Sequence, residues 1–324
     1  MHDIINFLKG AVDREATTSV NGCYMFKGGY IHARNNFLHA IFAAEGKVEF
    51  NVPASELDAA LARMPEIQSL KIKGDVLTIK CGRLSSNIKL IMNEAHDLPD
   101  MPEEWNFMPD GFTSSLTKAV LFLGEIGWTQ GISISDERVM AVRNNRGIDI
   151  KVENLHLDSP VLITKEVAKF LIAQGDPSEY AEVPYSNNRE GVSAIMFRWE
   201  DGRVVKAQLL DMQAQNVDRV FDEAGTETPL LITSEWREAY EDAVGLSDGK
   251  ITITPKGFKT VKGVANNTVD FPMPELPEGH ESHWETDNLN PMLEVGTAWN
   301  PNAYPDKALF TGDGVRGLVM GFRK

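Results

Sequence analysis

One arrangement of helical and strand-like patterns comes back three times along this chain. Residues 3–15 place apolar side chains at helical spacing, and strand-like segments follow over 21–29 and 30–45, with a Gly-Gly turn between them. A second helical pattern covers 54–66, where Ser55 is the predicted N-cap, and two or three strands follow over 69–92. The predicted unit is therefore a helix, a strand pair, a second helix and a second strand pair.

The same unit is predicted again from about residue 111 and, more faintly, from about residue 229. The first helices of the three copies begin near Asp3, Ser114 and Ser234, which gives a period of about 110 to 120 residues. A period of that length indicates three tandem copies of one domain, and it is too long for a solenoid. We place the domains at 1–106, 107–224 and 225–324, because the segments 92–111 and 212–229 are polar or Pro-rich and unpatterned, as linkers are.

Each copy is predicted to be an α+β domain. Two amphipathic helices per copy have to cover one face of an antiparallel sheet, because a strand pair and a helix each bury only one side. At 324 residues and 42% hydrophobic content, the chain can bury enough core for two or three such domains.

Composition also limits where the protein works. The sequence has no apolar run as long as a membrane helix, and the segment "MHDIINFLKGAVDRE" carries charges where a signal peptide keeps its apolar core. We therefore expect a soluble cytoplasmic protein without membrane contact. The two cysteines, Cys23 and Cys81, lie in strand-like contexts without a C-x-x-C motif, which predicts reduced structural thiols.

The net charge of −15 argues against a protein whose whole surface grips nucleic acid. Counterion release, which drives such binding, needs lysines and arginines that face phosphates. A single basic face on an otherwise acidic protein is compatible with this charge.

The segment "TGDGVRG" places Gly312, Gly314 and Gly317 at the spacing of a dinucleotide-binding turn. That motif needs a helix after the glycines to receive the pyrophosphate, and an acidic residue about twenty positions later. Only residues 318–324 follow here, and "LVMGF" is apolar and rich in strand formers. We interpret the segment as a turn that leads into a last strand, in which Gly312 and Gly314 are free to take positive φ.

Other candidate chemistry is weak. His280, Glu281 and His283 lie close together, but their spacing is not H-E-x-x-H and the stretch is predicted to be a loop. His32 and His39 are predicted to share one strand and, at an odd separation, to face opposite sides, so that they cannot share a metal. The sequence shows no nucleophile motif, P-loop or pair of acids with a base. We predict no catalytic residues, no metal and no cofactor, and thus a protein that is not an enzyme.

Several strings of the sequence are together typical of one family. They include "FNVPASELDAALARMPE", "GDVLTIKCGRLSSNIKLIMNEAHDLPDMPE", "RVMAVRNNRGIDIKV", "VLITKEVAKFLIAQG", "AQLLDMQAQNVDRVF" and the ending "LVMGFRK". In this order and spacing the chain resembles the bacterial sliding clamps, the beta-subunit processivity factor of the replicative DNA polymerase. It is shorter than cellular clamps, has "RNNRG" where the family usually has a T-D-G-H-R-like turn, and has Gly321 in place of a proline. These departures resemble a clamp encoded by a bacteriophage or plasmid.

The resemblance implies a homodimer that closes head to tail into a ring of six domains around double-stranded DNA, without base readout. The helices would line the hole, and their basic residues are the candidate DNA contacts: Lys9, Arg14, Arg63, Lys118, Lys165 and Lys169. In the third copy the fifth helix sets only Arg237 against four acidic residues, and the sixth helix has no basic residue. Either loops with Lys256, Lys259 and Lys262 contact DNA there, or those helices are turned or shortened relative to the family.

The resemblance also implies a pocket between the second and third domains, where the DNA polymerase and the clamp loader insert a short, partly apolar peptide. The matching positions in this chain are Ile148, Phe221, Leu318, Met320, Phe322 and Arg323. An alternative interpretation is that Leu318, Met320 and Phe322 alternate on one strand face and only pack the core. The alternative function, suggested by the weak positive charge of the third copy, is a clamp-like interaction scaffold or decoy that does not encircle DNA.

Overall fold

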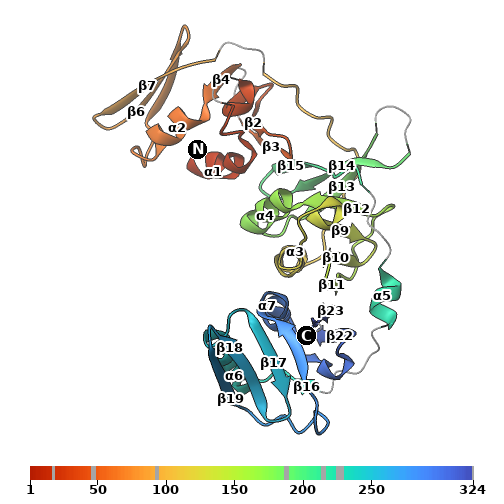
Figure 1. The fold of residues 1–324 in the computed structure, drawn as a ribbon. Coiled ribbons are helices and arrows are strands. Elements are labelled where there is room, and N and C mark those ends of the chain that lie inside the picture. The colour runs from red at the N-terminus through yellow and green to blue at the C-terminus, as the bar shows by residue number, and fades with distance from the viewer. Residues whose placement is uncertain are drawn as a thin grey trace. The chain divides into compact units, whose positions relative to one another are not determined.

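The computed structural model of the chain describes residues 1–16, 19–44, 49–91, 95–185, 190–212, 217–223 and 230–322 (Figure 1). These residues form two compact units, one of residues 1–110 and 169–209 and the other of residues 111–168 and 210–324. Arg323 and the predicted domain boundary after residue 224 lie outside the described residues. In the described chain no helix is both long and apolar enough to span a membrane.

The order of elements repeats three times as a helix, four strands, a helix and three strands, and we call each such run a repeat. The first repeat consists of α1 (His2–Leu8), β1 (Cys23–Lys27), β2 (Tyr30–Arg34), β3 (Leu38–Ala43), β4 (Phe50–Pro53), α2 (Ala54–Leu61), β5 (Ser69–Lys73), β6 (Val76–Cys81) and β7 (Leu84–Lys89). The second consists of β8 (Asn106–Phe107), α3 (Phe112–Val120), β9 (Gly131–Ser135), β10 (Arg138–Arg143), β11 (Arg146–Lys151), β12 (Val161–Thr164), α4 (Lys165–Gln174), β13 (Glu179–Pro184), β14 (Val192–Arg198) and β15 (Arg203–Gln208).

The third repeat has the same order and is preceded by one additional helix, α5 (Asp218–Glu223). It consists of β16 (Leu230–Leu231), α6 (Ser234–Gly245), β17 (Lys250–Thr254), β18 (Gly257–Lys262), β19 (Ala265–Asp270), β20 (Ser282–Glu285), α7 (Thr286–Val295), β21 (Ala298–Trp299), β22 (Lys307–Gly312) and β23 (Val315–Met320). The short strands β8 and β16 stand before the first helix of their repeats, and the described residues show no counterpart before α1.

All strand pairs of the described chain are antiparallel. The first unit contains an eight-stranded sheet in the order β4-β1-β2-β3-β15-β14-β13-β8 and a three-stranded sheet β5-β6-β7. The second unit contains an eight-stranded sheet β12-β9-β10-β11-β23-β22-β21-β16 and a four-stranded sheet β19-β18-β17-β20. With helices segregated from antiparallel sheets, the predicted α+β class is confirmed.

Two repeats are joined within each eight-stranded sheet, and both junctions have the same register. In the first unit β3 pairs with β15, so that Ala40, the third residue of its strand, lies opposite Val205, also a third residue. In the second unit β11 pairs with β23, and the third residues Ile148 and Gly317 face each other in the same way. The junction is therefore a repeated structural element, like the repeats themselves.

The helices pack on the sheets (Figure 1), and most of the side chains that they bury there are apolar. On α3 the residues Phe112, Leu116 and Ala119 are fully buried, at the spacing of one helix face, and the helix packs on β9, β10 and β11. On α6, which packs on β17, β18 and β19, Trp236 and Tyr240 are buried, one turn apart. Helix α6 begins with a side-chain cap, because the hydroxyl of Thr233 accepts a hydrogen bond from the Trp236 N–H at 3.2 Å.

The segment 30–45, predicted to be one strand, is two strands, and this overturns the conclusion about its histidines. Asn35 starts the turn between β2 and β3, because its side-chain oxygen accepts hydrogen bonds from the N–H groups of Phe37 and Leu38, both at 2.9 Å. His32 and His39 therefore lie on neighbouring strands, with Nδ1 of the first 2.9 Å from Nε2 of the second. They are buried partners, and they do not face opposite sides.

Three further predictions of local structure were wrong. Ser55 does not cap its helix, because α2 begins at Ala54 with Pro53 in the N-cap position. The segment predicted to be an unpatterned second linker contains the helix α5. The stretch around His283, predicted to be a loop, forms strand β20 and pairs with β17.

Candidate functional site

A pocket of about 350 Å³ opens in the second unit, beside the C-terminal strand. Helix α5 and the residue before it contribute one wall, and β23 with β22 contributes another. The turn between β10 and β11 and a short 3-10 segment at Trp128 complete it. Its lining includes Trp128, Val142–Gly147, Val217, Val220, Phe221, Lys307, Leu318 and Met320.

Three of the residues predicted for a peptide pocket line this one. Phe221 and Leu318 are 2% and 5% exposed, and they form an apolar cluster with Leu309, against which Val217 and Val220 also pack. Met320 is half-buried and lines the pocket near its rim. Leu318 is buried in the cluster and also borders the pocket, so β23 contributes both to the core and to the wall of the pocket.

Two other residues predicted for the pocket, Ile148 and Phe322, lie outside its lining. Ile148 is fully buried opposite Gly317, and it is absent from the pocket lining. Phe322 packs near His283, with 5.9 Å between ring centroids, and the ammonium of Lys250 lies 4.9 Å from the centre of its ring. Arg323 lies outside the described residues.

Ion pairs hold α5 against the sheet and thereby position the wall of the pocket. Asp149 on β11 is buried, and its carboxylate accepts two hydrogen bonds from Arg138, both at 3.0 Å, and one from Arg316 at 2.7 Å. The same two arginines reach both ends of the short helix α5: Arg138 pairs with Asp218 at 2.6 Å and Arg316 with Asp222 at 3.4 Å.

The electrostatics agree with this geometry. The hydrogen bond to Asp149, reinforced by Asp218, raises the pKa of Arg138 above its ordinary value, and the hydrogen bond from Arg138 lowers the pKa of Asp218. The guanidinium of Arg316 also lies 5.3 Å from the ring centre of Phe221. One charged cluster therefore fixes α5 so that Phe221 faces the pocket.

Arg146 is the most buried of several polar residues of the pocket that the sequence predictions missed. It is 9% exposed, and one of its Nη atoms donates to the backbone oxygen of Asp287. Its Nε atom is buried without a hydrogen-bond partner among the described residues. Burial, and secondarily the charge of Arg143, lowers its pKa. Sequence reasoning placed Ile148 here, although the residues of the turn that precedes it form the lining.

The predicted DNA contacts of the first unit are partly neutralised. Lys9, in the 3-10 turn after α1, and Arg14 both pair with Asp58 on α2, at 3.7 and 3.1 Å. Asp58 is mostly buried and also accepts a hydrogen bond from the hydroxyl of Tyr24 at 2.8 Å. The helical surface formed by α1 and α2 thus presents two cations that share one carboxylate, together with the exposed Arg63.

The remaining predicted contacts lie on α3 and α4. Lys118 is half-buried in the last turn of α3. Lys165 and Lys169 are both exposed on α4, one helical turn apart. For these three lysines the structure shows no ion pair with any residue that it describes, so their charge is available to a ligand.

Three of the cations considered for the third repeat are engaged within the protein itself. Arg237 on α6 donates to the backbone oxygens of Leu293 and Gly296, the latter at 2.8 Å, and so caps the end of α7. Lys259 and Lys262 lie on β18 and not in loops, where Lys259 pairs with Glu281 at 3.1 Å and Lys262 donates to a backbone oxygen. Lys256 is exposed in the preceding turn.

The histidine and carboxylate groups do not assemble a metal site in the described part of the chain. His283 lies 3.6 Å from Glu281 and accepts or donates a hydrogen bond with Thr252, while His280 contacts Ser282. Each of these histidines is therefore engaged with a neighbouring side chain.

No family model matches the sequence, and no curated protein matches it. The fold, in contrast, matches solved structures along almost the whole chain. The DNA polymerase sliding clamp of Pseudomonas aeruginosa superposes with a TM-score of 0.77 at 15% identity, covering 99% of this chain and 96% of the other. The beta subunit of the Streptococcus pyogenes DNA polymerase superposes with a TM-score of 0.77 at 13% identity, covering 99% of this chain and 97% of the other.

A third similar structure is the Helicobacter pylori beta clamp bound to a DNA ligase peptide. It gives a TM-score of 0.76 at 11% identity, again covering 99% of this chain and 97% of the other. Identities this low establish the fold and leave the activity to be argued from the site. The chain therefore has the α+β fold of the bacterial DNA polymerase sliding clamps.

Proposed function

We propose that this protein is a sliding clamp, a processivity factor that encircles double-stranded DNA as a head-to-tail homodimer and tethers the replicative DNA polymerase. The observation that carries the proposal is a junction that the described chain leaves open. In the element order of the repeats, β7 corresponds to β15 and β23, and β19 corresponds to β3 and β11. Yet within the described residues β7 pairs only with β6, and β19 only with β18. A second copy of the chain supplies the missing partner for each.

The register of this intermolecular junction follows from the two junctions within the chain. Third residues face each other in both, which places Asn267 of β19 opposite Ser86 of β7 in the partner. Two-residue turns precede both strands, so the N–H and C=O groups of Ser85 point away from β6, and those of Thr268 point away from β18. The inferred register sets these two residues opposite each other as a hydrogen-bonded pair.

The side chains at the two edges are compatible with this pairing. Leu84, 50% exposed, would lie opposite Val269, and Arg83 would lie next to Asp270 of the other copy. Two such junctions close a ring and leave neither edge open to aggregation. A ring retains DNA by enclosure, so a chain of net charge −15 needs only a modest set of cations, such as Lys118, Lys165 and Lys169, facing the duplex.

Blocking the β7 edge is expected to open the ring. A proline at position 85 removes an outward N–H without breaking the ladder to β6, so Ser85→Pro should weaken dimerisation at least about tenfold. The matched control, Ser85→Val, keeps the N–H group and should remain dimeric.

Light scattering of the unmodified chain is expected to give about twice the 36.0 kDa of one chain. A stable monomer at micromolar concentration would contradict the ring.

Encirclement itself is tested by topology. After loading, the protein should stay on closed circular DNA and dissociate from the same DNA once it is linearised, because enclosure ends where the duplex ends. Equal retention on both forms would favour the alternative, an interaction scaffold or decoy that does not encircle DNA. The specific observation in favour of that alternative is that Arg237, Lys259 and Lys262 are engaged within the third repeat.

We further propose that the pocket beside β23 binds clamp-binding peptides of the polymerase and the clamp loader. Its lining combines apolar side chains with the cations Arg143, Arg146 and Lys307, and Met320 is a flexible side chain that can adapt to several ligands. The unpartnered Nε of Arg146 offers one buried donor to a peptide carbonyl or carboxylate. The peptide-bound Helicobacter pylori clamp supports this class of ligand.

A charge at the pocket rim is expected to abolish this binding. Met320→Glu should weaken the binding of a labelled DNA ligase peptide of the Helicobacter pylori type at least about tenfold, because the carboxylate removes apolar contact surface and lies opposite Lys307, a cation of the pocket lining with which it can pair. Phe322→Ala is the matched control: it alters the same end of the chain outside the pocket lining and should leave the affinity unchanged. Fluorescence anisotropy measures both. Equal losses in the two variants would indicate disruption of the terminal strand and contradict a local pocket.

A bacteriophage or plasmid origin and a cytoplasmic location remain part of the proposal. The origin is supported by the departures from cellular clamps in the turn at 143–147 and at Gly321, and the location follows from the proposed role on DNA.

A further inference from the structure

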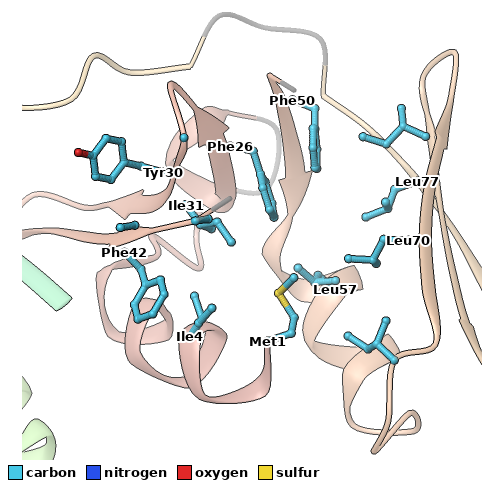
Figure 2. A pocket seen from close by; sticks show the side chains of 15 residues that line it. Met1, Ile4, Phe26, Tyr30, Ile31, Phe42, Phe50, Leu57, Leu70 and Leu77 are labelled. Carbon is cyan, nitrogen blue, oxygen red and sulfur yellow. The ribbon is translucent and has the colours of Figure 1, made fainter. Parts of the chain in front are cut away.

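An apolar groove of about 890 Å³ lies in the first unit, between the β5-β6-β7 sheet and the rest of the first repeat (Figure 2). Leu70, Ile72 and Leu77 line it from the three-stranded sheet. Across the groove lie Leu57 and the stacked rings of Phe26 and Phe50, whose centroids are 4.2 Å apart. A cavity of this size is within the range of about 300–1,000 Å³ that ligand sites occupy.

The groove is open to solvent along a strand that lacks a neighbour. Leu70 and Ile72 on β5 are 44% and 37% exposed, which is unusual for aliphatic side chains that face an apolar cavity. Among the described residues β5 pairs only with β6. Lys73 and Val76 flank a two-residue turn and therefore form a hydrogen-bonded pair between β5 and β6. Along β5 every second residue hydrogen-bonds to β6, so the N–H and C=O groups of Leu70 and Ile72 face the open edge.

The other two repeats show what belongs at this edge. The strand equivalent to β5 is β13 in the second repeat and β21 in the third. A short antiparallel strand pairs with each of them: β8 with β13, where Asn106 lies opposite Tyr180, and β16 with β21, where Leu231 lies opposite Ala298. In the first repeat this position is unfilled within the described chain, and Met1, 37% exposed, lines the groove beside it.

The face of the sheet opposite the groove is basic. Lys71 and Lys73 on β5 share that face with Lys80, because Ser69 pairs with Lys80 and side chains alternate along a strand. All three lysines are exposed, and the structure shows them in no ion pair with residues that it describes. In a chain of net charge −15, such a cluster next to an open strand edge attracts carboxylates.

We propose that the β5 edge and the apolar groove form a docking site for an extended acidic segment of another protein. The segment adds as an antiparallel fourth strand, with apolar side chains at alternate positions in the groove and carboxylates at the intervening positions over Lys71 and Lys73. Backbone hydrogen bonds to Leu70 and Ile72 give it affinity, and the alternation of apolar and acidic residues gives it specificity. The site is separate from the pocket beside β23, and it requires no DNA.

The test uses the full chain and two short fluorescein-labelled peptides, one alternating valine with glutamate and the other alternating valine with lysine. In anisotropy titrations at low salt, the glutamate peptide is expected to bind at least about tenfold more tightly than the lysine peptide. Ile72→Pro removes the outward N–H and should weaken the glutamate peptide at least about tenfold, whereas Ile72→Val, which keeps the N–H, should change its affinity less than about twofold.

A second pair of substitutions changes only exposed side chains and is expected to leave the fold intact. Lys71→Glu with Lys73→Glu changes two exposed side chains and should reverse the preference between the two peptides. Equal affinity of the Ile72→Pro and Ile72→Val chains would overturn strand addition, and an unchanged preference in the lysine variant would overturn the acidic ligand. A fall in solution mass on Ile72→Pro would show that a second copy of this chain occupies the edge, which would overturn a foreign partner.

Discussion

Replacing Gly317 with alanine is expected to lower the free energy of unfolding by about 3 kcal/mol, the upper part of the range for overpacked cores. A Cβ atom at this position would lie 2.0 Å from Cζ of Phe310 and 2.7 Å from the backbone oxygen of Gly147. Phe310 is fully buried in the strand next to Gly317. To accommodate the new Cβ, either its ring has to leave its packed position or the paired strands β11 and β23 have to move apart.

Denaturant unfolding of the variant measures this loss, with Gly245→Ala as the matched control. Gly245 lies in the last turn of α6, and a Cβ there would meet nothing within 4 Å. That substitution should leave stability unchanged or raise it by up to about 1 kcal/mol. If Gly317→Ala cost no more than the control, the close contact with Phe310 would not describe the protein in solution.

The three glycines of the "TGDGVRG" segment differ in what their positions require. Gly314 has a φ of +62° and forms the turn between β22 and β23, as predicted. Gly312 is not left-handed, and it is required instead because a Cβ would lie 2.3 Å from the backbone oxygen of Val295. Gly317 makes room for an aromatic ring. Three glycines at the spacing of a nucleotide motif therefore have three separate structural causes.

Acidification from about pH 7 to pH 5 is expected to cost about 4 kcal/mol of stability through the paired histidines. His32 and His39 are buried, with 0% and 6% exposure, and burial is the largest cause that lowers their pKa values, to about 4 and about 3. Nearby positive groups, including Arg34 and His96, lower them further. In the unfolded chain both titrate near the ordinary value of about 6.5.

The direction follows from these values. Below about pH 6.5 the unfolded chain binds two protons that the folded chain refuses, so the stability present above that pH is lost as the pH falls. Protonation of both rings would also leave two donors facing each other across 2.9 Å. Urea unfolding at a series of pH values measures the slope, and the double variant His32→Gln with His39→Gln should flatten it between pH 7 and 5. An unchanged slope would assign the acid sensitivity to other groups.

The sequence predicted the α+β class and the threefold recurrence well, because both depend on long apolar patterns. The prediction of local structure failed where a single polar side chain determines the path of the backbone. Asn35 turns the chain between β2 and β3 by accepting two backbone hydrogen bonds, and the pattern around it reads as one continuous strand. The position of His39 beside His32 depends on that turn.

The pocket was predictable from sequence only in part. The resemblance to the clamp family identified Leu318 and Met320, and both residues border the cavity. Arg146 was missed because its role depends on where the turn after β10 lies, and Phe322 was assigned to the pocket although the chain has already turned toward His283. The helix α5 was missed as well, because ion pairs from Arg138 and Arg316 hold six residues that carry little helical pattern.

The positions of the tryptophans allow unfolding and peptide binding to be followed by intrinsic fluorescence. Trp236, Trp284 and Trp299 pack edge to face in the third repeat, with centroids 6.2 and 5.1 Å apart, and each is at most 1% exposed. Because these three indoles are buried, a red shift of tryptophan emission is expected when that repeat unfolds, with a further contribution from the buried Trp199 of the second repeat. Trp128, half-buried, lines the pocket beside β23, so quenching or a spectral shift of its indole can follow the arrival of a peptide without any attached dye.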